Sequence, residues 1–438
     1  RLERITQAYC RFYSLKINHV MLKHILTIIK NERRQNIGLW IELLIVAIFL
    51  WYIVDNVYVT LNNYYKPLGF DTEHTYIMRL GLLNENSYEY VKDIPEETAV
   101  GYLHTALERI RQNPMIEAAS LSLHSSPHIG SNRSSSIYRD TLQTRYGVLN
   151  RTVTPDFFRV FRYQSINGST DELVQALERN ELVISPGVAK ELFKAGESPV
   201  GKQVSFSKGD SVELYRVGAV SDIVRYDNFS SWNTYFAQRM DNDFLGNFSG
   251  EWVVGLEFCV RVKPEEDRDF IRRFRLDMTQ QLRLGNYYLG EIQSIPVNKK
   301  VFQKDDINNL KMKMFVVVFL LINIFLGITG IFWFRTQHRR SEIGLRVSLG
   351  DTSGQVLRRY YLEGLLLLTT AMLPAMIVVY ILGREGVFAT YLMRFTAGRY
   401  FIGFIITYAL LALMIVLGIR VPARKAVNVP PAEALRDE

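Results

Sequence analysis

The chain has little cysteine, with two residues in 438, Cys10 and Cys259. The basic residues at the ends of the apolar runs described below place Cys10 on the cytoplasmic side of a membrane and Cys259 on the opposite side. The two therefore cannot pair with each other. We expect Cys259 to be a buried apolar thiol rather than half of a disulfide bridge.

The sequence also lacks a motif for nucleotide hydrolysis. The nearest approach is Gly196-x4-Gly201-Lys202, but Gln203 stands where a phosphate-binding loop needs Ser or Thr to hold magnesium. This segment follows an expected helix and precedes an expected strand, which is the reverse of the order that such a loop requires. No aspartate-rich partner motif occurs elsewhere, so we expect the chain not to hydrolyse ATP alone.

Patterns for other catalysis and for metal binding are equally weak. The seven histidines are scattered, and His124 and His128 flank Pro127 in a loop rich in Ser and Gly, which does not support a helical metal-binding pair. Ser185 lies in ISPGVAK and not in a G-x-S-x-G elbow. No catalytic, cofactor-binding or metal-binding residue is therefore predicted in this chain.

What the sequence does contain is four long apolar runs. Each is about as long as the roughly 20 residues that a helix needs to cross the hydrocarbon core of a membrane. The runs are residues 37–60, 313–334, 360–382 and 401–419. The formal net charge of +8 could suggest nucleic-acid binding, but the basic residues crowd at the ends of the runs. That distribution indicates membrane topology, so we expect lipid and not nucleic acid as the surroundings of these residues.

The loop between the second and third runs is strongly basic. Its arginines are Arg335, Arg339, Arg340, Arg346, Arg358 and Arg359, against only Glu342 and Asp351. Such a loop beside two spans is cytoplasmic by the positive-inside bias, which places both termini in the cytoplasm as well. The loop after the third run, which this topology places outside the cytoplasm, also contains arginine. It is therefore an exception to the positive-inside bias.

The same loop has the pattern of a short helix at the membrane surface. Ser341 can cap its start, Gly350 can end it, and Asp351, Thr352 and Ser353 can cap the helix that follows.

The block between the first two runs contains two similar units. One reads as strand 75–83, helix 96–112 and strand 116–124, and the other as strand 256–263, helix 265–284 and strand 287–295. Two such β-α-β units separated by a long insertion predict a small α+β sandwich with a second lobe inserted. The predicted fold is thus four transmembrane α-helices plus a large α+β extracytoplasmic domain between the first and second helices.

These patterns divide the chain into the following segments. They are a cytoplasmic segment (1–36), the first span (37–60), the outer domain (61–312, with a split lobe 61–124 and 256–312 and an inserted lobe 125–255), the second span (313–334), a cytoplasmic loop (335–359), the third span (360–382), an outer loop (383–400), the fourth span (401–419) and a cytoplasmic tail (420–438). Apolar residues at helical spacing in 17–29 predict an amphipathic surface helix. Because Arg1 is not expected to be a natural start and Met21 is a plausible one, it stays open whether residues 1–20 belong to the native chain.

The basic loop also carries a family resemblance. RRSEIGLRVSLG, residues 339–350, followed by VLRRYYLEGLLLL, resembles the R-x-x-E-I-G-x-R-x-x-L-G signature of the FtsX/MacB-type ABC transporter permeases. Ser348 and Asp351 stand where alanine is more usual. PARKAVNVPPAEALR, residues 422–436, resembles the closing motif of the family. Within the insertion, VTPDFF and PVGK resemble elements of its extracytoplasmic core domain.

This resemblance implies a permease subunit that forms a homo- or heterodimer in the cytoplasmic membrane and pairs with a separate ATP-binding subunit. ATP and magnesium would then belong to the partner, and ATP-driven motion would reach the outer domain to move a peptide, a lipoprotein or a drug. The residues that it implies contact the ATPase are Arg339, Arg340, Glu342, Ile343, Gly344, Leu345, Arg346, Leu349 and Gly350. On a helix, Glu342 and Arg346 would share one face, and Ile343 with Val347 would offer an apolar anchor on a neighbouring face.

Two alternatives remain at this point. The short helix could be a basic amphipathic helix that rests on anionic headgroups. The whole chain could instead be a membrane-anchored ligand sensor without an ATPase, although the cytoplasmic segments are short for an output domain. An ATPase that co-purifies with the chain would decide between a sensor and a permease.

Overall fold

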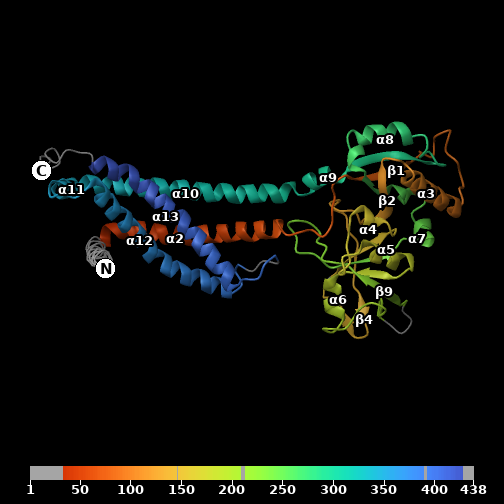
Figure 1. The fold of residues 1–438 in the computed structure, drawn as a ribbon, viewed down its shortest axis with the longest axis horizontal. Coiled ribbons are helices and arrows are strands. Elements are labelled where there is room, and N and C mark those ends of the chain that lie inside the picture. Colours follow the sequence, from red (N-terminus) through yellow and green to blue (C-terminus); the bar gives the residue numbers. More distant parts are fainter. Residues whose placement is uncertain (1–32, 146, 209–212, 389–391, 428–438) are drawn as a thin grey trace, which may run out of the picture. The chain divides into compact units, whose positions relative to one another are not determined.

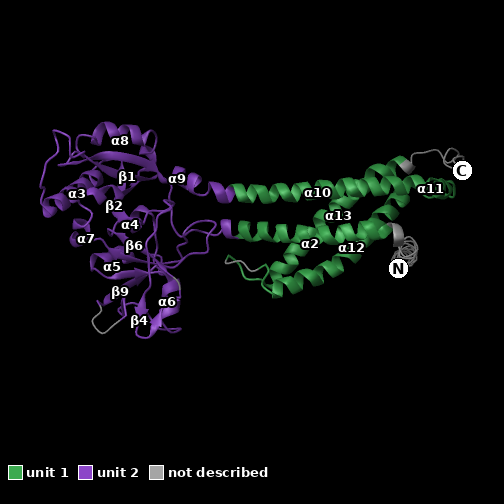
Figure 2. Cartoon of the chain, turned by 180° about the vertical axis from the view of Figure 1, so that it is seen from behind, with its two compact units in different colours: residues 1–62, 308–438 green, residues 63–307 purple. Residues whose placement is uncertain are grey.

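The computed structural model describes residues 33–145, 147–208, 213–388 and 392–427. It forms two compact units, one from the described parts of residues 1–62 and 308–438 and the other from residues 63–307 (Figure 2). The predicted surface helix at 17–29 lies outside the described residues, as does most of the C-terminal motif.

The first unit, the membrane bundle, consists of helices (Figure 1). They are α2 (Arg33–Tyr64), α10 (Lys304–His338), α11 (Arg340–Ser348), α12 (Ser353–Arg384) and α13 (Ala397–Val427). All of these except α11 are long and apolar enough to cross a membrane, so the four predicted spans are confirmed as helices. The helix α10 begins nine residues before the second apolar run, because a helix can continue in polar sequence outside the hydrocarbon core.

Small residues let the helices of the bundle approach one another. A Cβ atom added at Gly364 of α12 would lie 2.7 Å from side-chain atoms of both Ile415 and Ile419 of α13. One added at Gly403 of α13 would lie 2.5 Å from the indole nitrogen of Trp51 on α2. A larger side chain at either glycine would force these helices apart.

The second unit, the outer domain, is built on a ten-stranded sheet (Figure 1). Its strands, in spatial order, are β12 (Tyr287–Ser294), β1 (Thr75–Leu82), β11 (Leu256–Val262), β2 (Ile116–Leu123), β6 (Val148–Val153), β10 (Tyr235–Arg239), β7 (Leu182–Ile184), β9 (Tyr215–Val220) and β8 (Gln203–Val204), with β3 (Ser134–Ser135) beside β6. A separate hairpin pairs β4 (Tyr138–Arg139) with β5 (Leu142–Gln143). The helices of this domain are α3 (Glu96–Arg111), α4 (Phe157–Val160), α5 (Thr170–Glu178), α6 (Pro186–Leu192), α7 (Asn242–Gly246), α8 (Phe270–Met278) and α9 (Ile295–Phe302), with 3-10 turns at Glu251–Gly255 and Pro264–Glu266.

The two predicted β-α-β units interleave in this sheet. The strands of the first unit, β1 and β2, lie on either side of β11 from the second unit, and every neighbouring pair from β12 to β2 is antiparallel. The strand β11 is buried along its whole length, which fits its place inside the sheet. The predicted α+β domain between the first and second spans is thus confirmed.

The inserted segment continues the same sheet. Strand β2 pairs with β6 through Ser122 opposite Val153 and Leu123 opposite Thr152, and the remaining strands follow from β6. The boundaries between the lobes therefore stay a prediction, because the backbone pairing runs across them.

Two local expectations meet different outcomes. The helix predicted over residues 265–284 is wrong in length, because α8 spans only Phe270–Met278 and Asp269 before it has a positive φ of 53°. Aspartate tolerates this left-handed conformation, which interrupts a helix. The Cys259 thiol is free and buried as predicted, and burial raises its pKa.

Candidate functional site: the coupling loop

The basic loop forms a short helix between two long ones. Helix α10 ends at His338, Arg339 leaves the helical conformation, and α11 then begins without a side-chain cap. Ser341, the predicted cap, lies inside the first turn of α11, because the helix begins at Arg340 and not after Ser341. Thr352 precedes α12 as predicted, and its backbone N–H donates to Oε1 of Gln355 at 2.8 Å.

The end of α11 is set by a glycine. Gly350 has a φ of 102°, and its N–H donates to the carbonyl oxygen of Val347 at 3.1 Å. The N–H of Asp351 donates to the carbonyl oxygen of Arg346 at 3.0 Å. This is the Schellman arrangement, and the predicted stop at Gly350 is confirmed.

One face of α11 is turned toward the bundle. Ile343 and Gly344 are buried, and Ile343 belongs to the apolar core that the membrane helices share. Val347 is partly buried against the same core. The pair expected to anchor a partner therefore packs on this chain's own helices and fixes α11 to them.

The opposite face is open and partly apolar. Leu345 is 51% exposed and Leu349 is 79% exposed, and their spacing of four residues puts them side by side on a helix. Beside them Oε1 of Glu342 accepts hydrogen bonds from Arg346, at 3.0 Å from Nε and 2.6 Å from Nη2. Such exposed pairs contribute only about 0.3–0.5 kcal/mol, so the two charges can exchange partners at little cost. We call Glu342, Leu345, Arg346 and Leu349 the outward face.

The start of the loop is tied to the bundle by a carboxylate that the sequence analysis missed. Glu363 of α12 is buried, and it accepts hydrogen bonds from Arg335 of α10 at 2.7 Å and from Arg339 at 3.3 Å. Arg335 also donates to the side-chain oxygen of Asn36 on α2. Glu363 thus joins the loop to α10 and α12, and Arg335 extends the network to α2. An acidic residue one turn inside an apolar run is itself a signal that could have identified it. Arg340, half-buried, is the remaining predicted contact.

A second buried ion pair joins α2 to α13. The carboxylate of Asp55 accepts from Nε of Arg399 at 2.7 Å and from Nη2 at 2.5 Å, and both side chains are fully buried. Arg399 further donates to the carbonyl oxygens of Met393 and Phe388. This pairing accounts for one of the arginines in the loop 383–400, because the charge of Arg399 is neutralised inside the protein.

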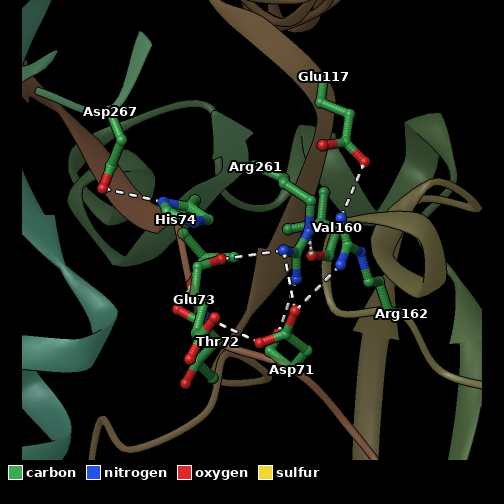
Figure 3. Close-up of polar contacts among 10 residues, drawn as sticks. Asp71, Thr72, Glu73, His74, Glu117, Val160, Arg162, Arg261 and Asp267 are labelled. Carbon is green, nitrogen blue, oxygen red and sulfur yellow. Dashed lines mark hydrogen bonds and ion pairs between the residues drawn. The ribbon is translucent and has the colours of Figure 1, made fainter. Parts of the chain in front are cut away.

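The outer domain has a buried arginine of its own, Arg261 on β11 (Figure 3). Its guanidinium donates to the carbonyl oxygen of Val160 at 2.7 Å, to that of Glu73 at 2.9 Å, and to both the side chain and the backbone of Asp71. Arg162 contacts the same Asp71 carboxylate at 3.4 Å. Burial lowers the pKa of Arg261, and Asp71 opposes that shift. With its hydrogen-bonding groups occupied by the protein, this cluster holds the chain together rather than offering a binding site.

Among the residues that the structure describes, no three His, Cys, Asp or Glu side chains are grouped so as to hold a metal ion.

Two protein families match the chain. The model of the MacB-like periplasmic core domain matches residues 71–272, and that of the FtsX-like permease C-terminal domain matches residues 314–431. The chain belongs to the FtsX/MacB-type family of ABC transporter permeases. The second match begins within α10 and covers α11, α12 and α13. With four membrane-spanning helices, the permease is a multi-pass protein of the inner membrane. Members of its family are membrane components that normally work with an ABC ATPase.

Solved structures resemble parts of the permease. The periplasmic region of MacB from Actinobacillus actinomycetemcomitans is 11% identical, with a TM-score of 0.33, and the match covers 52% of this chain and 93% of that one. A permease domain from Porphyromonas gingivalis is 18% identical, with a TM-score of 0.31, and the match covers 50% and 92% of the two chains. No curated protein matches the chain significantly.

Proposed function

We propose that this permease receives ATP-driven motion from a separate ATP-binding subunit, which docks on the outward face of α11. The partner holds ATP and magnesium, and the permease works as a homo- or heterodimer with both termini in the cytoplasm. The motion passes to the outer domain, where it serves export or extraction of a peptide, a lipoprotein or a drug. The observation that carries the proposal is the exposed pair Leu345 and Leu349 on a helix that is otherwise fixed to the bundle.

A docking helix needs an open face for its partner and a firm attachment behind it. The outward face supplies the first, with two exposed leucines beside a weak salt bridge that a partner's charges can replace. The buried Ile343 and the Arg339–Glu363 ion pair supply the second. A push on α11 is therefore passed to α10 and α12 and is not lost in a flexible loop.

Docking on a protein and resting on headgroups predict different effects of charge. Glu342→Lys adds a positive charge, which an anionic membrane surface tolerates or favours. A protein partner that has matched the Glu342–Arg346 pair meets a reversed charge instead. We expect Glu342→Lys and Leu349→Asp each to reduce co-purification of the ATP-binding subunit about tenfold, the effect of losing one central interface contact.

The matched control is Leu276→Asp on α8. Leu276 is 79% exposed, as Leu349 is, but lies in the outer domain. It should leave co-purification at the wild-type level. Equal loss in the control and in Leu349→Asp would show a general effect of an added charge and would contradict docking on α11. If no ATP-binding subunit accompanies the wild-type chain from detergent, the ligand-sensor alternative is favoured.

The connection behind the docking face is tested separately by Glu363→Gln. This variant keeps the shape of the side chain and the outward face, so the ATP-binding subunit should co-purify normally. Arg335 and Arg339 lose their carboxylate, however, and the link from the loop to α12 weakens. We expect nucleotide-dependent changes in amide hydrogen exchange of the outer domain to shrink. Unchanged responses would remove Glu363 from the path.

A further inference from the structure

A buried loop of the outer domain contacts both chain segments that lead to the first two spans. The loop, Arg225–Ser230, is part of the connection from β9 to β10, and we call it the clasp. Arg225, Asp227, Asn228 and Phe229 are all buried. Every contact used below lies within the outer domain.

The clasp first binds the segment that leaves α2. Nη1 of Arg225 donates to the carbonyl oxygens of Asn63 at 3.0 Å and Lys66 at 3.1 Å. Nδ2 of Asn228 donates to the carbonyl oxygen of Tyr64 at 2.9 Å, and Nδ2 of Asn63 donates back to the carbonyl oxygen of Asn228 at 3.0 Å. Two of these carbonyl groups, those of Asn63 and Tyr64, belong to the last turn of α2, where carbonyl groups have no partner within the helix.

The same loop binds the segment that enters α10. Gln303, the residue immediately before α10, is buried, and its Nε2 donates to Oδ1 of Asn228 at 2.9 Å. The two ends of one amide group therefore serve two segments that are distant in sequence. The side chain of Asn228 gives its hydrogen to the first segment and accepts one from the second.

The clasp is rigid in itself. Oδ1 of Asp227 accepts from the backbone N–H groups of Phe229 and Ser230, each at 2.6 Å. Nη2 of Arg225 donates to the carbonyl oxygens of Asn228 and Ser230. Bonds from a charged guanidinium are stronger than those between neutral groups, so the loop resists deformation when either segment moves.

The position of the clasp in the chain gives these contacts a consequence. The first segment continues along the chain toward β1, and the second follows β12 and α9, so the backbone itself connects both to the β12–β1 edge of the sheet. The strands β9 and β10 lie in the other half of the sheet, which has no such direct connection. The clasp bridges this gap by hydrogen bonds.

We propose that the clasp is the joint through which movement of the first two spans reaches the inserted half of the outer domain, with Asn228 as the positioning residue that holds both segments. The role in transport rests on the proposed function, whereas the mechanical link does not depend on a partner. A change in the separation of the two segments alters the bonds of Asn228 first, because it is bonded to both.

The experiment uses the full-length permease in nanodiscs, first without any partner. Gln303→Leu removes the bond between Gln303 and Asn228 and does not touch Asn63 or Lys66. We expect amide exchange in residues 63–66 and 225–232 to rise about fivefold, the effect of losing one buried hydrogen bond. The matched control is Asn298→Leu, which removes the 2.8 Å amide bond from Asn298 to Gln293 in the same connecting region. Asn298→Leu should leave amide exchange in residues 63–66 and 225–232 unchanged.

Exchange that stays at the wild-type rate at residues 63–66 in Gln303→Leu would overturn the clasp as a link between the segments. So would an equal rise in the control, because that would reflect general loosening.

A second arm adds the ATP-binding subunit and nucleotide. In the wild type we expect nucleotide to change exchange in both β12 and β10. In Gln303→Leu the change should persist in β12 and fall at least to half in β10, while co-purification of the ATP-binding subunit stays normal. An undiminished response in β10 would refute the role in transmission. If no ATP-binding subunit binds the wild type, the proposed function fails. The first arm, which needs no partner, still tests whether the clasp links the two segments.

Discussion

A buried histidine should make the outer domain less stable in mild acid. The side chain of His128 is 4% exposed, and among the described residues neither of its ring nitrogens has a hydrogen-bond partner. The ring lies between those of Phe70 and Phe302, with centroids 5.9 and 5.8 Å away. Burial lowers the pKa of His128 from 6.5 to about 4, and the positive charge of Lys299 adds to this effect.

The direction of the effect follows from proton uptake. Between pH 6.5 and pH 4 the unfolded chain binds a proton at His128 and the folded chain does not, so stability falls as the pH falls through this window. Below about pH 4 both states are protonated and this contribution no longer changes. From pH 7 to pH 5 the two pKa values give a loss of about 2 kcal/mol, at about 1.4 kcal/mol per pH unit and with partial titration at each end.

The measurement is pulse proteolysis of the detergent-solubilised permease in urea, which reports the free energy of unfolding of the outer domain at pH 7 and pH 5. His128→Phe keeps an aromatic ring between Phe70 and Phe302 and removes the titrating group, so its pH-dependent loss should be about 2 kcal/mol smaller than that of the wild type. Phe274→Leu is the control, because Phe274 is buried in another apolar cluster of the outer domain. It should lower stability at both pH values and leave the difference between them unchanged. Equal pH dependence in His128→Phe and the wild type would refute the argument.

Three further predictions concern the membrane bundle and the topology. Arg399→Met leaves the Asp55 carboxylate buried without its partner, which should lower the free energy of unfolding by about 3–5 kcal/mol and lower the thermal midpoint in detergent. Adding Asp55→Leu should restore much of the lost stability. An Arg399→Met variant as stable as the wild type would argue against a stabilising ion pair. Cysteines introduced at Ser207 and Ser353 should be labelled from opposite sides of sealed vesicles, and labelling from one side would contradict the proposed topology. An isolated fragment 61–311 should fold as a soluble α+β domain, which circular dichroism would check; a spectrum of helix alone would count against an independent domain.

Local sequence patterns were sufficient to predict most helices and strands, but not which strands pair with each other. The four spans follow from apolar length, and β1, β2, β11 and β12 follow from short runs bounded by turn residues. The break at Asp269 depends on a single left-handed residue, which composition does not reveal. The pairing of β2 with β6 rests on two residue pairs, too few to leave a pattern in the sequence.

In the candidate site, too, the sequence does not predict which side chains contact each other. In SEIGLRVSLG the apolar residues recur at every second position, so the sequence cannot say which of them face inward. The structure separates Ile343, which is buried, from Leu345 and Leu349, which are exposed. The partners of Glu363 lie 24 and 28 residues away in the chain, and such pairings are set by helix packing, not by local spacing.

The ion pair between Asp55 and Arg399 has a consequence for how the protein is made. Its members are 344 residues apart, so the first span enters the bilayer long before its counter-charge has been synthesised. At about 5–20 residues per second, the delay is on the order of 20–70 s. During that interval the insertion machinery or the lipid headgroups have to accommodate the acidic side chain. A chain that stops before α13 never receives the arginine, and its Asp55 stays without the counter-charge that the complete fold supplies.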